Sequence, residues 1–208
     1  MYQKFTGVIL KKYPFGEADE ILTIYTKEAG KLVTKAVSSR KIKSKLAGAL
    51  QSLNEIDFET AGGKNIPVLI SVRTRTVNNY LRQNLRKFAH ALIGIETLYR
   101  LTADRQEHEG VYGSLLNFLR NLEKSTSENL EVRLFQVELL KLLGFGFDAG
   151  GSGLNEADRM ILDEMIAGRR PLRISCALEK AVEGFLDSVL EREIKSRKFL
   201  NQLSNSTT

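Results

Sequence analysis

The sequence predicts an α+β protein, in which a five-stranded OB-type β-barrel over residues 1–78 is followed by an all-helical domain over residues 79–208. Two observations predict this division. Hydrophobic residues alternate with period two up to about residue 76, whereas from Asn79 onward they recur every 3.6 residues. The chain has 208 residues, of which 42% are hydrophobic and 27% charged. It is therefore long enough for one large or two small globular domains.

The alternating part predicts half-buried strands. In its last strand, Val68, Ile70 and Val72 should face the core, and Arg73 and Arg75 should face solvent. Turn signals at 14–16, 28–30 and 62–65 separate the runs and leave about five strands. Residues 44–50 have a helical pattern, and an OB-type barrel places a helix between its third and fourth strands.

The helical part begins with a long helix from Asn79, whose expected apolar face is Leu81, Leu85, Phe88, Leu92, Ile95 and Tyr99. Glycine breaks separate further helices at 111–122, 130–143, 156–166 and 178–190. Apolar residues surround the axis of the helix at 130–143. We therefore expect it to be the central helix of a bundle.

Several functional classes are disfavoured. The single cysteine, Cys176, excludes an internal disulfide and a zinc site built from several cysteines of one chain, and it favours a reducing cytoplasm. No apolar stretch approaches the length of a membrane span, and no secretory signal is apparent. Common enzyme motifs are missing, and the Gly-x-Gly-x-x-Ala match at 144–149 follows a helix instead of a strand. We therefore predict a protein with no enzymatic activity, cofactor, bound metal or small-molecule substrate.

The positive charge is concentrated in the first part. Residues 1–78 contain 13 Lys and Arg against 7 Asp and Glu, whereas residues 79–208 contain 18 of each. Such a surplus favours a polyanionic partner, although a solvated loop without any partner is the alternative. If the cations lie on one continuous surface of the barrel, they can hold the phosphates of a single-stranded nucleic acid. The candidate DNA-binding residues are Lys31, Lys35, Arg40, Lys41, Lys43, Lys45, Arg73 and Arg75.

Two aromatic residues near the first turn could complete a single-strand binding surface, because bases stack on exposed aromatic rings regardless of sequence. They are Tyr13 and Phe15, on either side of Pro14. The alternative is that both rings plug an end of the barrel.

Arg133 is unusual within the predicted central helix, because its neighbours Leu130, Val137 and Leu140 are apolar. A cation in such surroundings needs a partner. One alternative is an ion pair with a glutamate of an adjoining helix. The other is capture of a carboxylate from an incoming peptide whose apolar side chains fill an adjacent groove.

Four segments resemble the bacterial recombination mediator family RecO. The run Gly16–Lys31, followed by Ser44–Gln51, is similar to the family's N-terminal signature. Arg133–Gly144 resembles its central helix, and Lys195–Leu200 resembles its C-terminal Lys-Ser-Arg segment. The four segments occur in the family's order and span almost the whole chain.

This resemblance implies an OB fold, a helical domain and activity without covalent chemistry. RecO proteins bind single- and double-stranded DNA, anneal strands coated by single-strand binding protein and, with RecR, help to load RecA. In this family the acidic C-terminal tail of single-strand binding protein docks on the helical domain, and the resemblance implies the same contact here, with Arg133 matching a basic position. Arg40 matches a family arginine. A cytoplasmic, nucleoid-associated location is implied.

The chain departs from the family pattern in one respect. Many relatives carry a four-cysteine zinc module after the central helix. No cysteine lies there in this chain, so we expect the module to be absent.

Two other functions remain open on the residues alone. One is RNA binding by an OB-fold protein, because the barrel chemistry is shared. The other is a protein adaptor that does not bind DNA and whose basic segment is only a solvated surface. A helix-turn-helix regulator is less favoured, because the helical part has no net positive charge.

Overall fold

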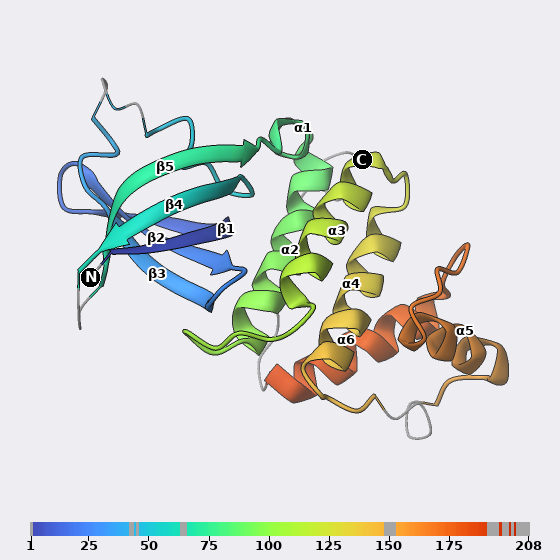
Figure 1. Cartoon of the computed structure of the whole chain (residues 1–208). Coiled ribbons are helices and arrows are strands. Elements are labelled where there is room, and N and C mark those ends of the chain that lie inside the picture. Colours follow the sequence, from blue (N-terminus) through green and yellow to red (C-terminus); the bar gives the residue numbers. More distant parts are fainter. Residues whose placement is uncertain are drawn as a thin grey trace. The chain divides into compact units, whose positions relative to one another are not determined.

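The computed structural model describes residues 2–41, 44, 46–62, 66–147, 153–190, 196, 200 and 202. The predicted fold class is confirmed: five strands close into a barrel, and helices follow (Figure 1). The chain folds into two compact units. The first comprises residues 1–79 and 102–107, and the second comprises residues 80–101 and 108–208. No helix in the described part of the chain is long and apolar enough to cross a membrane.

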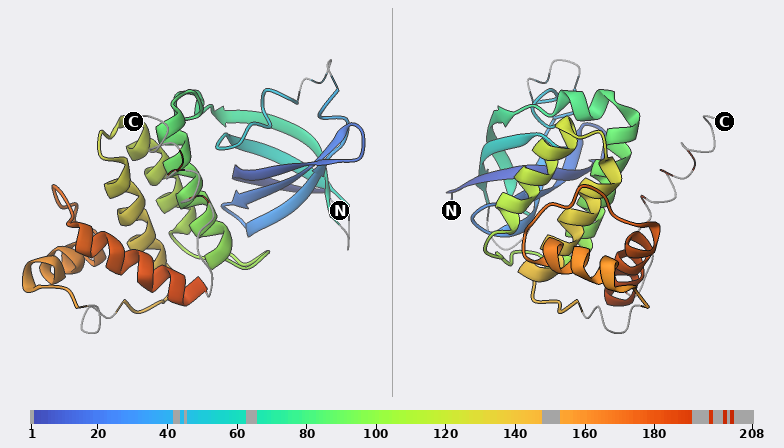
Figure 2. Two further views of the ribbon diagram at one scale, coloured as in Figure 1. Left: turned by 180° about the vertical axis from the view of Figure 1, so that it is seen from behind. Right: turned by 90° about the vertical axis from the view of Figure 1, so that its right-hand side faces the viewer.

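The barrel contains β1 (Tyr2–Phe15), β2 (Asp19–Thr26), β3 (Gly30–Ala36), β4 (Glu55–Ala61) and β5 (Val68–Thr76), in the closed order β1-β2-β3-β5-β4. Strand β1 pairs with β4 through its first half and with β2 through its second half. A register shift between Ile9 and Lys11 in β1 bends the strand between these two partners. Figure 2 shows the strands from two further directions.

The barrel interior is filled by aliphatic and aromatic side chains from every strand. Fully buried members include Ile9, Leu22, Ile24 and Ile56, with Phe58 at 2% exposure. Burying this apolar surface is the main favourable term in folding the first unit.

The inward face of β5 differs from the predicted alternation. Ile70 is 48% exposed, whereas Leu69 is buried. The cause is a register shift between β4 and β5. Glu59 pairs with Ser71, but the next residue, Thr60, pairs with Leu69. Ile70 is therefore the extra residue of a β-bulge.

The helix expected at 44–50 is not present among the described residues of this segment. The described residues 46–50 make a turn in which the Leu50 amide donates to Leu46 O.

Residues 102–107 belong to the barrel unit although they follow a helix in sequence. The Arg105 amide donates to Lys31 O at 2.8 Å, and Asp104 forms a bridge with Lys31. Gly30 makes this approach possible: its φ is +63°, and a Cβ at this position would lie 1.9 Å from Gln106 O.

The second unit contains α1 (Asn79–Gln83), α2 (Leu85–Leu101), α3 (Val111–Lys124), α4 (Glu128–Leu142), α5 (Glu156–Ile166) and α6 (Cys176–Leu190). Helix α4 is central, as expected, because α2, α3, α5 and α6 all pack against it (Figure 1). The single helix expected from Asn79 is broken at Asn84. Because of this break, Leu85 is 54% exposed and does not continue the buried face of Leu81.

Helices α2 and α3 approach closely at a glycine. Gly94 of α2 faces Phe118 of α3, whose ring stacks on Phe135 of α4 with centroids 4.4 Å apart. A Cβ on Gly94 would lie 2.4 Å from Cε1 of Phe118. No side chain fits between the two helices at this point without displacing the stacked rings.

We therefore expect Gly94→Ala to lower the free energy of unfolding by about 1–3 kcal/mol, the usual cost of overpacking a core. Urea denaturation measures this change. The control is Gly113→Ala in α3, where an added Cβ has no neighbour within 4 Å. It should be neutral or stabilising by up to about 1 kcal/mol, because alanine is the better helix former. Equal effects of both substitutions would contradict the close packing at Gly94.

Candidate nucleic-acid interface

One part of the barrel wall brings the predicted aromatic residues and several predicted cations together. We call Tyr13, Phe15, Lys35, Arg40 and Lys41 the Phe15 surface. Tyr13 of β1 pairs with Ile21 of β2, which pairs in turn with Lys35 of β3. The Lys35 ammonium lies 4.9 Å from the centroid of the Phe15 ring. Phe15 lies two residues after Tyr13 on β1, so this pairing brings its ring within reach of Lys35 across β2.

The two aromatic rings of this surface face solvent. Tyr13 is 52% exposed and Phe15 is 51% exposed, and neither belongs to the hydrophobic cluster inside the barrel. The alternative that they plug a barrel end is therefore wrong. A large apolar ring that remains half exposed is available for stacking by a base.

The segment after β3 folds back on the turn between β1 and β2. The Arg40 amide donates to Ala18 O at 2.9 Å, and its guanidinium Nη1 donates to Gly16 O at 3.3 Å. The Ser38 amide donates to the Asp19 carboxylate at 2.8 Å. These bonds hold Arg40 beside Phe15's turn while its side chain stays exposed. Lys41 is exposed next to it, and Lys43 and Lys45 lie outside the described residues.

Asp19 partly offsets the charge of this surface. Its carboxylate lies 2.8 Å from Lys35 Nζ. The hydrogen bond from Lys35, followed by that from the Ser38 amide, holds the pKa of Asp19 below its ordinary value of 3.8. Lys35 is thus an ion-pair partner as well as a candidate contact, whereas Arg40 and Lys41 have no ion pair among the described residues.

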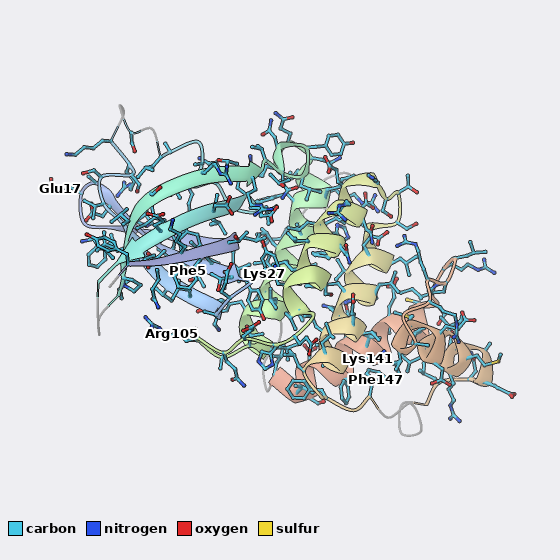
Figure 3. All side chains as sticks on the ribbon, in the orientation of Figure 1. Phe5, Glu17, Lys27, Arg105, Lys141 and Phe147 are labelled. Atoms are coloured by element: carbon cyan, nitrogen blue, oxygen red, sulfur yellow. The ribbon has the colours of Figure 1, made fainter. Side chains whose placement is uncertain are left out.

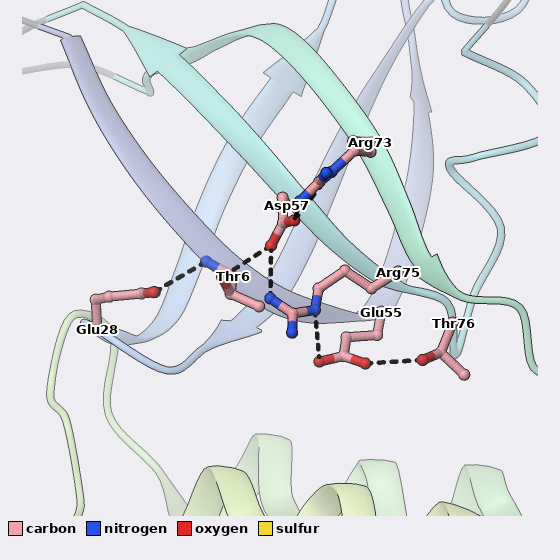
Figure 4. Close-up of polar contacts among 7 residues, drawn as sticks. All are labelled: Thr6, Glu28, Glu55, Asp57, Arg73, Arg75 and Thr76. Carbon is pink, nitrogen blue, oxygen red and sulfur yellow. Dashed lines mark hydrogen bonds and ion pairs between the residues drawn. The ribbon is translucent and has the colours of Figure 1, made fainter.

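Arg73 and Arg75 lie on another part of the barrel wall, where they lean across β4 (Figure 4). Arg73 Nη2 lies 2.7 Å from Asp57 Oδ2, and Arg75 Nη1 lies 3.1 Å from Asp57 Oδ1. Arg75 Nε also lies 3.5 Å from Glu55. The Thr6 hydroxyl completes the cluster by donating to Asp57 at 3.0 Å. Both arginines are therefore neutralised locally, although the Arg73 side chain is 81% exposed.

The acidic residues of this wall bind the barrel's own cations. Besides Asp57 and Glu55, Glu59 pairs with Lys4 at 3.1 Å. A groove of about 490 Å³ runs past Lys4, Phe5, Asp57, Glu59 and Arg73. Three acids, Glu28, Asp57 and Glu59, line the groove against two bases, Lys4 and Arg73. The groove therefore has no surplus of positive charge with which to attract a polyanion.

Lys31 is committed to the barrel itself. The residue is 7% exposed, and its ammonium donates to Thr102 O at 2.6 Å and lies 3.4 Å from Asp104. It fastens residues 102–107 to the start of β3. The expectation of one continuous cationic surface is therefore wrong, because Lys31 is buried and Arg73 and Arg75 are directed toward β4. Figure 3 labels Glu17 and Lys27, which precede and follow β2 in the sequence.

The predicted peptide-binding residues on α4 are buried. Leu130 is 5% exposed, Val137 2% and Leu140 1%, and the last two pack against residues of α5 and α6. Their apolar surface is thus covered by the protein's own helices, and no open groove lies along these residues. This corrects the expectation of a groove at this position.

Arg133 is bonded to two side chains inside the helical unit. Its guanidinium donates to Glu183 of α6 and to Gln136 Oε1 at 2.7 Å. Gln136 in turn donates to the Thr97 hydroxyl at 3.1 Å. Of the two partners considered for Arg133, the glutamate of an adjoining helix is the one present. Glu183 remains 31% exposed at its side chain.

Among the described residues, no three His, Cys, Asp or Glu side chains gather into a group that could hold a metal ion. The glycine match at the end of α4 is a helix end, as expected. Gly144 has a φ of +79°, and the Phe145 amide donates to Leu140 O at 2.8 Å. Residues 148 and 149 of that match lie outside the described residues.

Ser196 of the Lys-Ser-Arg segment is bonded within the helical unit. The Ser196 amide donates to Glu96 of α2 at 2.7 Å, and its hydroxyl donates to the same oxygen. Glu96 also pairs with Arg100 at 2.6 Å. This segment therefore satisfies a buried carboxylate.

Comparison of the sequence with known protein families identifies the family to which the chain belongs. Residues 1–77 match the family model for the recombination protein O N terminal, and residues 82–150 match that for the recombination protein O C terminal. The chain belongs to the RecO family. It is thus a DNA repair and recombination protein of a family of non-enzymatic recombination mediators, and the resemblance found in the sequence is confirmed.

Individual relatives agree with this membership. The DNA repair protein RecO of Symbiobacterium thermophilum is 24% identical over 245 residues, which cover 96% of this chain and 97% of the relative. That of Listeria monocytogenes serotype 4a is 22% identical over 243 residues, covering 97% and 94%. That of Dehalococcoides mccartyi strain 195 is 29% identical over 144 residues, 68% of this chain but only 56% of the relative. Helices α5 and α6 lie beyond residue 150, where the family-model match ends.

The Asp57 cluster predicts how stability depends on pH. The hydrogen bond from Arg73, followed by those from Arg75 and Thr6, lowers the pKa of Asp57 below 3.8. A lowered folded-state pKa contributes stability above the unfolded-state value, and this contribution is lost as pH falls through the folded-state pKa. We expect Asp57→Asn to reduce the difference in melting temperature between pH 6 and pH 2.5. Arg73→Gln with Arg75→Gln should reduce it as well, because it removes the main causes of the shift. An unchanged difference in both variants would contradict this assignment.

Proposed function

We propose that this chain is a recombination mediator that binds DNA through the Phe15 surface. The observation on which the proposal rests is the contact between a half-exposed aromatic ring and the Lys35 cation, with exposed Arg40 and Lys41 beside it. A single strand needs cations for its phosphates and rings for its bases, and this surface offers both. Lys43 and Lys45 follow directly in the sequence and can extend the cationic track.

The same surface accounts physically for annealing of complementary strands. Two DNA strands repel one another, and a surface that neutralises phosphates lowers the barrier to their meeting. Contacts that are weak and sensitive to salt then allow the duplex product to leave. Annealing of strands coated by single-strand binding protein, and loading of RecA together with RecR, are the roles that membership of the RecO family supports for this chain.

We further propose that the helical unit receives the C-terminal tail of single-strand binding protein. If Arg133 takes part, the carboxylate of the tail has to replace that of Glu183, which already occupies the guanidinium. Glu183 is partly exposed, so its side chain can leave without unfolding α6. Leu130 is also buried. Val137 and Leu140 become accessible only if α5 and α6 shift away from α4.

Salt dependence tests the DNA-binding role. If about four phosphates are neutralised, the slope of log affinity against log salt should be near −3 for a single strand, at about 0.7 per contact. Arg40→Gln with Lys41→Gln should reduce the slope by about 1.4, because two contacts are lost. The matched control, Arg73→Gln with Arg75→Gln, removes the same charge from residues that are already paired and should change the slope little. Fluorescence anisotropy with a labelled oligonucleotide measures both. A flat salt response of the unaltered protein would refute phosphate binding.

A strand-annealing assay tests the mediator role. The unaltered protein should speed annealing of bare strands and of strands coated by single-strand binding protein, and Phe15→Ala should slow both reactions. A stacked base contributes about 1–3 kcal/mol, so we expect a loss of DNA affinity of about fivefold or more. Tyr2→Ala is the control, because Tyr2 is also an exposed aromatic residue of β1 but lies outside the Phe15 surface. If neither kind of strand is annealed faster, the mediator role fails. A competition experiment between single-stranded DNA and RNA of equal length distinguishes a DNA-binding from an RNA-binding protein. Preferential binding of DNA supports the role in DNA repair, and preferential binding of RNA supports the alternative.

A further inference from the structure

The loop that joins α5 to α6 combines three arginines with a completely exposed leucine. It contains Arg169, Arg170, Pro171, Leu172 and Arg173, and residues 167–177 include no acidic residue. Leu172 is 99% exposed, and Arg169 and Arg173 are exposed on either side of it. The loop projects from the helical unit in both Figure 1 and Figure 2.

The start of this loop is held firmly to the helices. At the end of α5, the Gly168 amide donates to Met165 O and the Arg169 amide donates to Glu164 O at 2.8 Å. Gly168 has a φ of +77°, which completes the left-handed helix end. Lys141 of α4 donates from Nζ to Ile166 O at 2.8 Å. The side chain of Arg169 therefore extends from a backbone position that hydrogen bonds hold in place.

Arg170 fastens the middle of the loop to the central helix. Its guanidinium makes two parallel hydrogen bonds to Glu131 of α4, one of them at 2.7 Å, and Glu131 is 3% exposed. Burial alone would raise the pKa of Glu131, but the hydrogen bonds from Arg170 and Ser125 lower it, so the carboxylate stays ionised. A bidentate pair of this kind fixes orientation as well as position. One of the three arginines is thus structural.

The end of the loop is the start of α6. The Leu178 amide donates to the Ser175 hydroxyl at 3.0 Å, and Ile174 packs against the core that α4, α5 and α6 share. The N-terminus of a helix carries partial positive charge, which adds to that of Arg173. Glu179 in the first turn offsets part of this charge.

Leu172 makes no contribution to the core of the protein, yet the loop displays it between two arginines that have no ion pair among the described residues. Arginine beside apolar wedges such as leucine or proline is the combination that enters the minor groove and contacts base steps, while arginine alone neutralises phosphates. A rigid loop loses little conformational freedom on binding. These properties favour a nucleic acid as the partner.

We propose that the loop at 169–173 is a second DNA-contacting surface, located on the helical unit. Arg169 and Arg173 bind phosphates of the sugar-phosphate backbone, and Leu172 contacts sugars or bases between them. The inference rests on the proposed DNA-binding function and adds a second surface to it. Each of the two units then has a DNA contact of its own, which suits a protein that has to hold two strands.

Charge reversal at Arg169 and Arg173 tests the proposal. In Arg169→Glu with Arg173→Glu, two phosphate contacts are lost. The salt slope should therefore fall by about 1.4 for a labelled single strand and by about 1.8 for a duplex. The control is Arg120→Glu with Arg159→Glu, which changes the net charge equally at exposed positions of α3 and α5. Anisotropy measures both variants on both forms of DNA, and their thermal melting curves verify that the fold is intact. A loss confined to one form identifies whether single strands or duplexes use the loop.

A second variant keeps the charge constant. Leu172→Ser removes a side chain that is 99% exposed and should not affect the fold. We expect it to weaken DNA binding at least threefold while leaving the salt slope unchanged, because an apolar contact is lost and no phosphate contact is. If the Arg169 and Arg173 variant binds both forms of DNA like its control, the proposal is overturned.

The two proposals fail in different ways. If Arg40→Gln with Lys41→Gln weakens DNA binding and Arg169→Glu with Arg173→Glu does not, only the second surface is wrong. If the unaltered protein binds neither form of DNA, the proposed function itself is wrong. If the loop variant alone weakens binding, the second surface holds and the Phe15 surface fails.

Discussion

The barrel depends on one strand that pairs along both of its edges. Residues 2–8 of β1 pair with β4, and residues 7–15 pair with β2, so a single bent strand closes the ring. The register shift between Ile9 and Lys11 provides the bend, and Gly7 permits the close crossing, because a Cβ there would lie 2.6 Å from Ile24. Closure leaves the second half of β1 beside β2, across which Phe15 meets Lys35 of β3, and the first half beside β4, where Thr6 meets Asp57. The same strand therefore contributes to both groups of charged residues on the barrel.

Ion pairing decides which cations are available to a partner. A guanidinium that is already bound by a carboxylate has to lose those bonds before it binds a phosphate, and the exchange of one anion for another gains little. Arg73 and Arg75, which Asp57 and Glu55 hold, therefore differ from Arg40, whose described side-chain contact is a backbone carbonyl. Exposure alone is a poor guide for the same reason: Arg73 is among the most exposed cations of the barrel, yet its charge is matched locally.

Much of the fold could be predicted from the sequence because periodicity reports which residues face a core. The change of period near Asn79 indicated the change from strands to helices, and the apolar circumference of residues 130–143 indicated the central helix. Periodicity fails where backbone pairing is irregular. Ile70 alternates correctly with Val68 and Val72 in sequence, but the bulge opposite Glu59 adds one residue and turns Ile70 outward. A bulge depends on the partner strand, so the sequence of β5 alone does not reveal it.

The candidate sites show a second limit, which concerns what covers a surface. The sequence indicates that Leu140 is apolar, but not that α5 and α6 of the same chain cover it. Likewise, the charge of Lys31 is evident, whereas its role in holding residues 102–107 depends on a contact 71 positions along the chain.

Averaging charge over a domain conceals sites as readily as it reveals them. The surplus in residues 1–78 pointed to the barrel, yet within the barrel much of it is taken up by internal pairs. The helical part sums to zero, yet the loop between α5 and α6 contains three arginines and no acid. What a polyanion experiences is the field within about one Debye length, roughly 8–10 Å at physiological salt, and not the sum over the domain. A unit that is neutral in sum can therefore still present a cationic loop, although Glu131, bonded to Arg170, and Glu179, in the first turn of α6, offset part of its charge. A mediator with one modest site on each unit has an advantage over one with a single strong site, because every contact is weak enough to release the duplex once it has formed.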